Sequence, residues 1–327
     1  MNYLRNLRCI DSHSHFSINE GEEKVGVECY FPREGNINDY YELAVNNNIV
    51  EAMLMPCPTP TIIRENGKII NTPITWQERN GKIVYFSRHI ENGKERIFEP
   101  KDNPYYEVNF RLRNYLLKHH SKGMNFNFIP LIHLVFDTPD YVDELISLKP
   151  KAFKVHGIGL GLDNFSKINT ALLKKIGESK IPIIVHTDFM DGLPKSKIEE
   201  VYKANDPLNW ISILEKYEIR ALLTHGVRLC KKSADIVKNS QLFCVGISPD
   251  LLIRSEPARI KMKGDYLQKL ITLVGTEYLL LDMDFPWNIT DRETFEPDDS
   301  IIKRMKKYIT DSELEDVVYN NAKSFFN

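Results

Sequence analysis

The chain has 327 residues, of which 42% are hydrophobic and 27% are charged, as in an ordinary folded globular protein. Its 43 lysines and arginines nearly balance 45 aspartates and glutamates, which argues against nucleic-acid binding by bulk positive charge. No apolar run approaches the roughly 18 residues of a membrane-spanning helix, and Arg5 and Arg8 interrupt the region that a signal peptide keeps apolar. We therefore expect a cytoplasmic protein that binds a small-molecule substrate, with neither a nucleic acid nor a membrane as partner.

Eight short runs rich in Val, Ile, Leu and Phe recur along the chain, and a helical pattern follows each. They span residues 8–11, 49–55, 126–133, 152–155, 181–186, 221–225, 242–247 and 278–282. Nearly continuous apolar runs are typical of buried parallel strands, and strands that alternate with helices predict βαβ units. Eight such units predict an α/β protein with a (β/α)8 TIM barrel, a single domain over residues 1–327. A doubly wound open sheet is the alternative.

Four polar residues stand where helices should begin. Asn103, Thr138 and Asp206 each precede a proline, and Asn38 precedes a further segment with helical spacing. A side chain that accepts a hydrogen bond followed by proline at the first helical position is a typical start signal. We expect helices to begin at these four residues.

The interval between the second and third predicted strands is about 70 residues long, far more than one crossover requires. Asn-Gly pairs at residues 66–67, 80–81 and 92–93 separate β-prone runs within it. Asn-Gly favours two-residue hairpin turns, so we predict an antiparallel β meander over residues 61–100, inserted after strand two. Because loops on that side of a barrel border the active site, we expect the insertion to be a lid or pocket wall. The alternative is a hairpin that is decorative or that forms an oligomer contact, as in a homodimer.

Polar residues end several of the predicted strands. The first strand runs into His13 and His15, which alternate and should face the same side, where two imidazoles can bind one metal ion. The other strand ends carry His133, His156, His186 and His225, with Asp282 and Asp284 after the eighth strand. The ends of barrel strands converge on one mouth, and buried polar groups need partners there. The set therefore predicts a metal or catalytic site rather than isolated buried histidines.

The ordered motifs resemble the amidohydrolase superfamily of metal-dependent barrel enzymes, in particular the branch that includes decarboxylases related to aminocarboxymuconate-semialdehyde decarboxylase. The motifs are the His-x-His pair and residues 153–156 (FKVH), 182–187 (PIIVHT), 225–226 (HG), 284–286 (DFP) and 320–326 (NNAKSFF). The resemblance runs from Ile10 to the C-terminus and leaves out only the insertion. It implies four metal ligands, which are His13, His15, His186 and Asp284. It also makes His225 a further ligand or a hydrogen-bonding catalytic residue.

Two positions leave alternatives open. The family usually has a small residue where this chain has Asp282, so either aspartate could be the ligand. We expect Asp284, which lies nearer the mouth. In binuclear members a strand-four lysine is carbamylated and bridges two metals. Here we expect one metal, with Lys154 paired to Asp282, and a second metal bridged by carbamylated Lys154 as the alternative.

The implied residues predict a chemistry. Three imidazoles and one carboxylate suit Zn²⁺, with Mn²⁺ as the alternative. The resemblance then implies a hydrolase in which a metal-activated water attacks an amide, lactone or ester-like bond, with Asp284 and His225 as catalytic residues. His156, Lys154 and Arg228 are candidate substrate-binding residues, and Arg228 could bind an anionic group or be a solvated loop arginine.

Two other functions stay open. One is metal-dependent non-oxidative decarboxylation of an aromatic or dienoic carboxylic acid. The other is an inactive barrel that serves as a binding module, which the intact His13, His15 and Asp284 set argues against.

Overall fold

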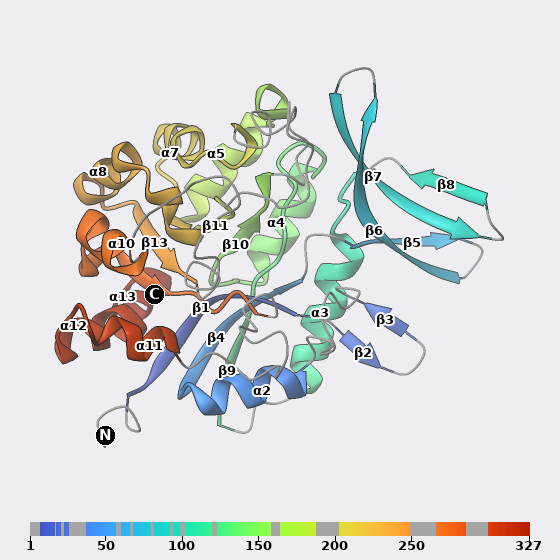
Figure 1. Cartoon of the computed structure of the whole chain (residues 1–327). Helices are drawn as coiled ribbons and strands as arrows, with labels where there is room; N and C mark the ends of the chain where they lie inside the picture. The colour runs from blue at the N-terminus through green and yellow to red at the C-terminus, as the bar shows by residue number, and fades with distance from the viewer. Residues whose placement is uncertain are drawn as a thin grey trace.

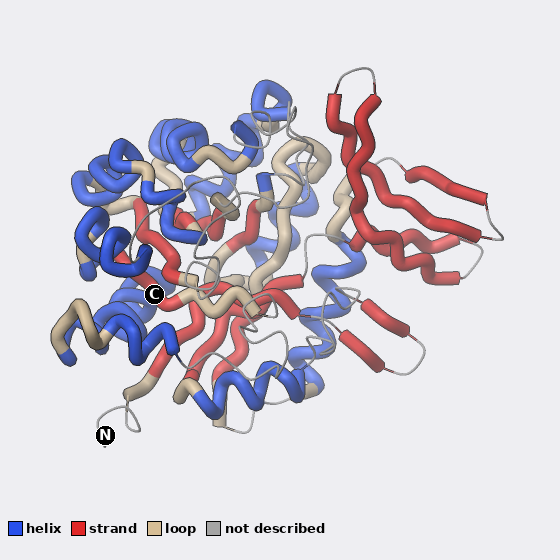
Figure 2. The backbone as a smooth tube through the Cα atoms, viewed as in Figure 1, coloured by secondary structure: helices blue, strands red, loops and turns tan. Residues whose placement is uncertain are grey.

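The computed structural model shows two parallel β-sheets surrounded by helices, with an antiparallel sheet to one side (Figure 1). The structure describes residues 7–16, 18–20, 23–25, 37–56, 60–65, 68–79, 82–91, 94–98, 102–119, 123–157, 164–187, 203–248, 266–285 and 300–327. Figure 2 shows the parallel strands in the interior and the helices around them. None of the helices in these ranges is long and apolar enough to cross a lipid bilayer.

Two parallel sheets contain the eight predicted strand runs. The first has the order β1-β4-β9 and the second the order β10-β11-β12-β13-β14. The strands are β1 (Cys9–Phe16), β4 (Ile49–Pro56), β9 (Asn125–Phe128), β10 (Phe153–Val155), β11 (Ile183–Val185), β12 (Ala221–Leu223), β13 (Phe243–Ile247) and β14 (Leu279–Leu281). Every pair within these sheets is parallel, so the predicted α/β class with parallel strands is confirmed.

Hydrogen bonds outside the strands connect the two sheets at both edges. Beyond β9, the amide of Lys154 donates to the carbonyl of Pro130 over 2.8 Å. Beyond β14, the amide of Asp284 donates to the carbonyl of His13 over 2.8 Å. The first and last parallel strands therefore lie side by side, and the residues that follow them share one end of the structure.

One cluster of buried apolar side chains draws on most of the parallel strands. Its members are Ile10, Met53, Met55, Ile129, Ala152, Ile184, Leu222, Leu280, Ala322, Phe325 and Phe326. Burying one large aliphatic or aromatic side chain stabilises the fold by about 1.5–3 kcal/mol. Side chains two positions apart on a strand share a face, so Lys154, His186 and Asp282 point to the same side as Ala152, Ile184 and Leu280. The apolar cluster thus packs directly below the polar residues at the strand ends, on the same face of the strands.

Helices cover the outer faces of both parallel sheets (Figure 2). They are α2 (Ile37–Asn46), α3 (Tyr106–Lys118), α4 (Pro139–Ser147), α5 (Thr170–Ser179), α7 (Pro207–Lys216), α8 (Lys231–Asn239), α10 (Tyr266–Val274), α11 (Ser300–Met305) and α12 (Asp311–Glu315). The last helix, α13 (Asn321–Phe326), instead packs its buried side chains into the interior apolar cluster. Two predicted starts are confirmed. The Thr138 side chain accepts from the Tyr141 amide over 3.3 Å, and the Asp206 side chain accepts from the Leu208 amide over 2.8 Å.

The other two predicted helix starts are wrong. Helix α3 begins at Tyr106, and Tyr105 precedes it without a side-chain cap. The Asn103 side chain instead accepts from the amide of Thr138 over 2.8 Å, so it joins two loops. Asn38 lies inside α2 rather than before it. The side chain of a capping residue can accept a hydrogen bond from any backbone amide that lies close to it in the folded chain. The sequence alone does not show which amide that is.

The antiparallel sheet has the order β5-β6-β7-β8 and comes between β4 and α3 in the chain. Its strands are β5 (Pro60–Glu65), β6 (Lys68–Arg79), β7 (Lys82–Glu91) and β8 (Lys94–Phe98). In each hairpin, two residues separate the last paired residue of one strand from the first paired residue of the next. Glu65 pairs with Lys68, for example, and Arg79 pairs with Lys82. The Asn-Gly pairs themselves lie outside the described residues. Figure 1 shows this sheet projecting from the parallel sheets beside α3, with a hairpin of β2 (Ile18–Glu20) and β3 (Glu23–Val25) nearby.

Candidate functional site

His13 and His15 lie in the second half of β1, and both side chains are buried. Strand β1 has one more residue than β4 between Asp11 and Ser14. One extra residue exchanges the two faces of a strand, so His13 and His15 lie on the same face as Ile10. The two imidazole rings meet edge to face, with centroids 4.8 Å apart.

The His13 ring lies between a lysine and an aspartate from other strands. Its Nε2 atom is 2.8 Å from Nζ of Lys154, and its Nδ1 atom is 2.9 Å from Oδ1 of Asp282. An ammonium group only donates, so with Lys154 protonated Nε2 accepts and the Nδ1 proton goes to Asp282. The expected pairing of Lys154 with Asp282 therefore runs through the His13 ring. Lys154 also uses the lone pair of Nε2 that a metal ion would need.

Three further histidines form a second group beside His13. The rings of His156 and His186 stack with centroids 4.3 Å apart, and Nδ1 of His186 is 3.0 Å from Nε2 of His225. Nδ1 of His225 is 3.2 Å from the hydroxyl of Ser248. Nε2 of His186 is buried and has no hydrogen-bond partner among the described residues. A buried imidazole nitrogen with no protein partner is available to a metal ion or a substrate.

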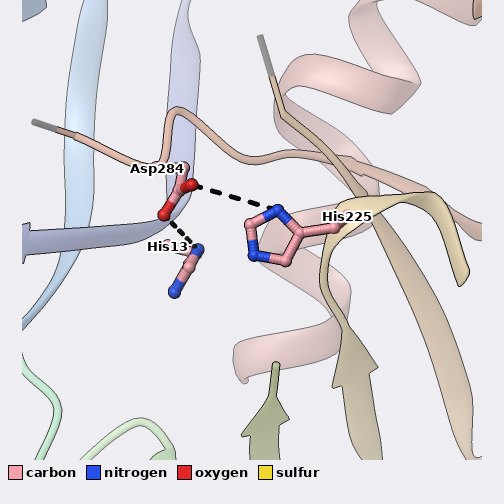
Figure 3. A group of neighbouring side chains, drawn as sticks. All are labelled: His13, His225 and Asp284. Atoms are coloured by element: carbon pink, nitrogen blue, oxygen red, sulfur yellow. Dashed lines mark ion pairs between the residues drawn. The ribbon is translucent and has the colours of Figure 1, made fainter. Parts of the chain in front are cut away.

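Asp284 connects the two groups of histidines (Figure 3). Its Oδ1 atom is 3.6 Å from Nδ1 of His13 and 3.9 Å from Nε2 of His15, and its Oδ2 atom is 3.9 Å from Nδ1 of His225. Potential ligand atoms of His13, His225 and Asp284 all lie within 4.8 Å of one another. The structure thus brings together the predicted histidine and aspartate positions of the site except His133, and His225 belongs to the group within 4.8 Å.

Burial favours the neutral form of four histidines of this site. It lowers the pKa of His13, His156 and His186 well below the ordinary 6.5, and it lowers the pKa of His15 to about 3. The charge of Lys154 acts in the same direction on each ring. The neutral imidazole is the form that ligates a metal.

The two aspartates have different surroundings. Asp282 is fully buried, and burial followed by the charge of Asp284 raises the pKa of Asp282 well above its ordinary value. A Cβ atom at Gly246 would come within 2.5 Å of Oδ2 of Asp282, so glycine makes room for this carboxylate. Asp284 is 5% exposed and lies closer to the opening. Metal-ligating histidines commonly donate their second N–H to a carboxylate, which fits Asp282 as the partner of His13 and Asp284 as the ligand.

His225 owes its position to an unusual turn after β12. Residues 225–229 all have positive φ, with 60° at His225, 62° at Gly226 and 46° at the buried Val227. A left-handed conformation is unfavourable by roughly 1–2 kcal/mol for each residue other than glycine. Such outliers cluster at functional sites, where the surrounding structure holds them. Asp284 shares this feature, with a φ of 48°.

Two predicted residues lie apart from the central group. Arg228 belongs to the left-handed turn, and its Nε atom donates to the carbonyl of Thr187 over 2.7 Å. This contact places Arg228 between the strand ends that carry His186 and His225. His133 accepts from the amide of Phe136 over 3.2 Å and donates its own amide to Asp137 over 2.7 Å. His133 therefore shapes the loop after β9.

Sequence reasoning missed the buried residues Asp11, Ser14 and Tyr40. The Asp11 carboxylate accepts from Ser14 Oγ over 2.5 Å and from the Tyr40 hydroxyl over 2.6 Å. Burial raises the pKa of Asp11 to about 6, although its hydrogen bonds act in the opposite direction. The one available signal was an acidic residue that directly follows the apolar start of the strand and stands two positions before His13.

The donor set fits a divalent metal ion. Neutral imidazoles with one carboxylate are the ligands of many Zn²⁺ sites, and the unpartnered Nε2 of His186 leaves a further donor. The same set suits Mn²⁺ less well, because that ion prefers oxygen ligands. The residues present are therefore compatible with the metal that the sequence predicts, on the condition that Lys154 gives up its contact with Nε2 of His13 when the ion binds.

No protein-family model matches the sequence, and no curated protein sequence does either. The fold, in contrast, resembles solved structures from the amidohydrolase superfamily. A 2,6-dihydroxybenzoate decarboxylase from Rhizobium has a TM-score of 0.57 and 12% sequence identity, over 98% of this chain and 98% of that chain. A 5-carboxyvanillate decarboxylase from Sphingomonas paucimobilis has a TM-score of 0.57 and 9% identity, over 98% and 99% of the two chains.

A hydrolase is among the similar structures as well. A probable 2-pyrone-4,6-dicarboxylic acid hydrolase from Acinetobacter baumannii, with citric acid bound, has a TM-score of 0.56 and 12% identity. That match covers 98% of this chain and 99% of the hydrolase. At such low identity the likeness shows a shared fold, so the reaction has to be argued from the site.

Proposed function

We propose that the chain is a metal-dependent hydrolase of the amidohydrolase superfamily that cleaves an amide, lactone or ester-like bond in a small molecule. The observation that carries this proposal is the group of His13, His225 and Asp284, whose ligand atoms lie within 4.8 Å of one another. Buried imidazoles beside a carboxylate at the ends of parallel strands are suited to bind a metal ion rather than to build a core.

We further propose that the two parallel sheets form one closed barrel and that β5 to β8 are an insertion within a single domain. The hydrogen bonds from Lys154 to Pro130 and from Asp284 to His13 support closure, because they join the sheets at both edges. The mixed origin of the interior apolar cluster supports it as well. In this arrangement the insertion, which follows β4, borders the mouth.

The proposed metal ligands are His13, His15 and Asp284 with one further imidazole. The 4.8 Å group favours His225 for that position, while the family resemblance and its unpartnered Nε2 favour His186. A divalent ion, Zn²⁺ or Mn²⁺, supplies an acidified water and a positive charge for a developing oxyanion when bound.

The chain's own residues then handle the proton and the substrate. Asp284 accepts the proton of the attacking water as the new carbon–oxygen bond forms, and returns it to the leaving nitrogen or oxygen as the old bond breaks. The two nitrogens of the His225 ring contact Ser248 and His186. Where His186 is the metal ligand, His225 donates to the substrate oxygen once that oxygen takes the place of one of these contacts. His156 and Lys154 line the same buried wall, and Arg228 at its edge binds an anionic substrate group.

Decarboxylation is the second candidate, because two of the similar structures are decarboxylases of aromatic acids. In that reaction Arg228 would orient a carboxylate. The carbon–carbon bond would break with release of carbon dioxide, and a proton would be delivered to the ring carbon that remains.

The test uses three probes on the metal-reconstituted protein. 2-Pyrone-4,6-dicarboxylate, a panel of amides, and 2,6-dihydroxybenzoate with 5-carboxyvanillate are each incubated with the enzyme. Ring opening or amide cleavage supports the hydrolase, and carbon dioxide release assigns the decarboxylase. Binding of a probe by calorimetry without turnover of any of them would point to a binding module.

A further inference from the structure

The carboxylate of Asp11 is fully buried, contacts helix α2 through Tyr40, and accepts from four donors. Its Oδ1 atom accepts from the amides of His13 over 3.1 Å and Met283 over 3.0 Å. Its Oδ2 atom accepts from the hydroxyls of Ser14 over 2.5 Å and Tyr40 over 2.6 Å. One side chain thus contacts the backbone beside two proposed metal ligands on different strands.

The segment after β14 is bound to β1 at three consecutive amides. The Met283 amide donates to Asp11, the Asp284 amide donates to the carbonyl of His13, and the Phe285 amide donates to Ser14 Oγ over 3.2 Å. Two of these three acceptors are side chains. An ordinary pair of strands would bond only through the backbone, so the side chains supply contacts where the ladder is irregular.

This anchored segment contains a backbone conformation that needs support. Asp284 has a φ of 48°, which residues other than glycine adopt only when their surroundings impose it. With that conformation, one carboxylate oxygen of Asp284 lies near His13 and the other lies near His225. The hydrogen bonds from the Met283 and Phe285 amides therefore hold the backbone on both sides of Asp284. The orientation of the Asp284 carboxylate in turn decides the geometry of the site.

We propose that Asp11 and Ser14 are positioning residues that fix the backbone of residues 283–285 and so aim the Asp284 carboxylate between His13 and His225. Tyr40 of α2 supports this positioning, because its hydroxyl donates a hydrogen bond to Oδ2 of Asp11. The role for Asp284 rests on the proposed function, whereas the anchoring of its backbone does not. The two parts are therefore tested by separate measurements.

The experiment uses the full chain with Co²⁺ as the metal probe. Variants Ser14→Ala, Tyr40→Phe, Asp11→Asn and Asp11→Ala are compared with two matched controls. Ser233→Ala removes a buried hydroxyl from α8, and Tyr141→Phe removes a buried phenol that accepts from Asn109 over 2.8 Å. Both controls lie outside the proposed site. Co²⁺ titration with its visible spectrum reports ligand geometry, and hydrogen exchange of the peptide spanning residues 279–285 reports the backbone.

We expect Ser14→Ala and Asp11→Ala to weaken Co²⁺ binding by about 10–100-fold, as loss of supporting partners does at metal sites. The spectrum should change and exchange at residues 283–285 should become faster. Asp11→Asn retains an acceptor for both amides and should keep most of the affinity that Asp11→Ala loses. Both controls should match the wild type. Ser14→Ala decides the matter if Asp11→Ala does not fold.

Wild-type exchange, affinity and spectrum in folded Ser14→Ala would overturn the proposal. If the wild type itself bound no Co²⁺, the proposed metal function would fail. Hydrogen exchange at residues 283–285 would then be the test of whether Asp11 and Ser14 fix this backbone. Faster exchange in Ser14→Ala would then still support it, and unchanged exchange would overturn it.

Discussion

The Nδ1 atom of His186 lies 3.0 Å from the Nε2 atom of His225, and this contact joins the two imidazoles that are candidates for the same ligand position. The Nδ1 atom of His225 lies 3.9 Å from Oδ2 of Asp284, and His225 belongs to the group of ligand atoms within 4.8 Å of one another. His186 stacks on His156, and its buried Nε2 atom has no hydrogen-bond partner within the described part of the chain. In the proposed site, one of these two imidazoles binds the metal directly and the other orients the ligating ring.

We predict that His225→Gln loses metal more completely than His186→Gln. His186→Gln should weaken metal binding by about 10–100-fold, as expected for a residue that orients a ligand. Metal content after dialysis and Zn²⁺ competition titrations measure both effects. A metal-free His186→Gln beside a metal-replete His225→Gln would restore the ligand set that the family resemblance implies.

Substitution of the two aspartates should separate catalysis from stability. Asp284→Asn keeps the shape but removes the basicity, so kcat should fall by about 10²–10⁴-fold, the usual range for loss of acid–base catalysis. Asp282→Asn should leave kcat within about tenfold but lower the free energy of unfolding by about 1–3 kcal/mol, because it disturbs a buried hydrogen bond to His13. Near-normal turnover in Asp284→Asn with a folded but inactive Asp282→Asn would show that the two roles are reversed.

Lys154 provides a test of metal number. Its Nζ atom lies 2.8 Å from the Nε2 atom of His13, where an ammonium group and a metal ion exclude one another. In a mononuclear site, Lys154→Met should retain one metal per chain, with affinity equal to or higher than that of the wild type. If Lys154 were carbamylated and bridged two metals, the variant would lose metal and added bicarbonate would activate only the wild type. Metal analysis of both proteins with and without bicarbonate distinguishes these cases.

Asp137 should make the stability depend on pH independently of the metal site. Burial raises its pKa to about 7, against an ordinary 3.8. The folded state therefore favours the protonated acid, so its contribution to stability is fully present below pH 4 and is lost as pH rises towards 7. Each pKa unit corresponds to about 1.4 kcal/mol. Urea unfolding between pH 4.5 and 8 should show wild-type stability falling relative to Asp137→Asn, and parallel profiles would refute this.

The parallel strands could be predicted because each is a short, nearly continuous apolar run between turn or capping residues. The site could be predicted in outline because polar residues such as His186 and Asp284 interrupt that pattern at the strand ends. The extra residue between Asp11 and Ser14 could not be predicted, although it sets the direction of His13. Without that extra residue, simple alternation of side chains along β1 would place the His13 ring on the opposite face of the strand from Ile10.

The left-handed turn was also beyond sequence reasoning. Only Gly226 signals it, whereas Val227 and Arg228 adopt the same backbone conformation without being suited to it. Tertiary contacts, including the bond from Arg228 to Thr187, hold the turn and bring His225 to Asp284. Likewise, the Asp11 contacts depend on two segments that are 272 residues apart in the chain. Such long-range hydrogen bonds leave no local pattern.

The most direct test of the account is the metal content of the purified protein together with its activity after chelation. The His13, His15 and Asp284 set with one further imidazole predicts about one divalent ion per chain, as at a mononuclear site with an open coordination position. Removal of that ion should abolish turnover of whichever probe the enzyme consumes, and Zn²⁺ or Mn²⁺ should restore it. A metal-stripped protein that remains folded and turns over its substrate at the original rate would contradict the account.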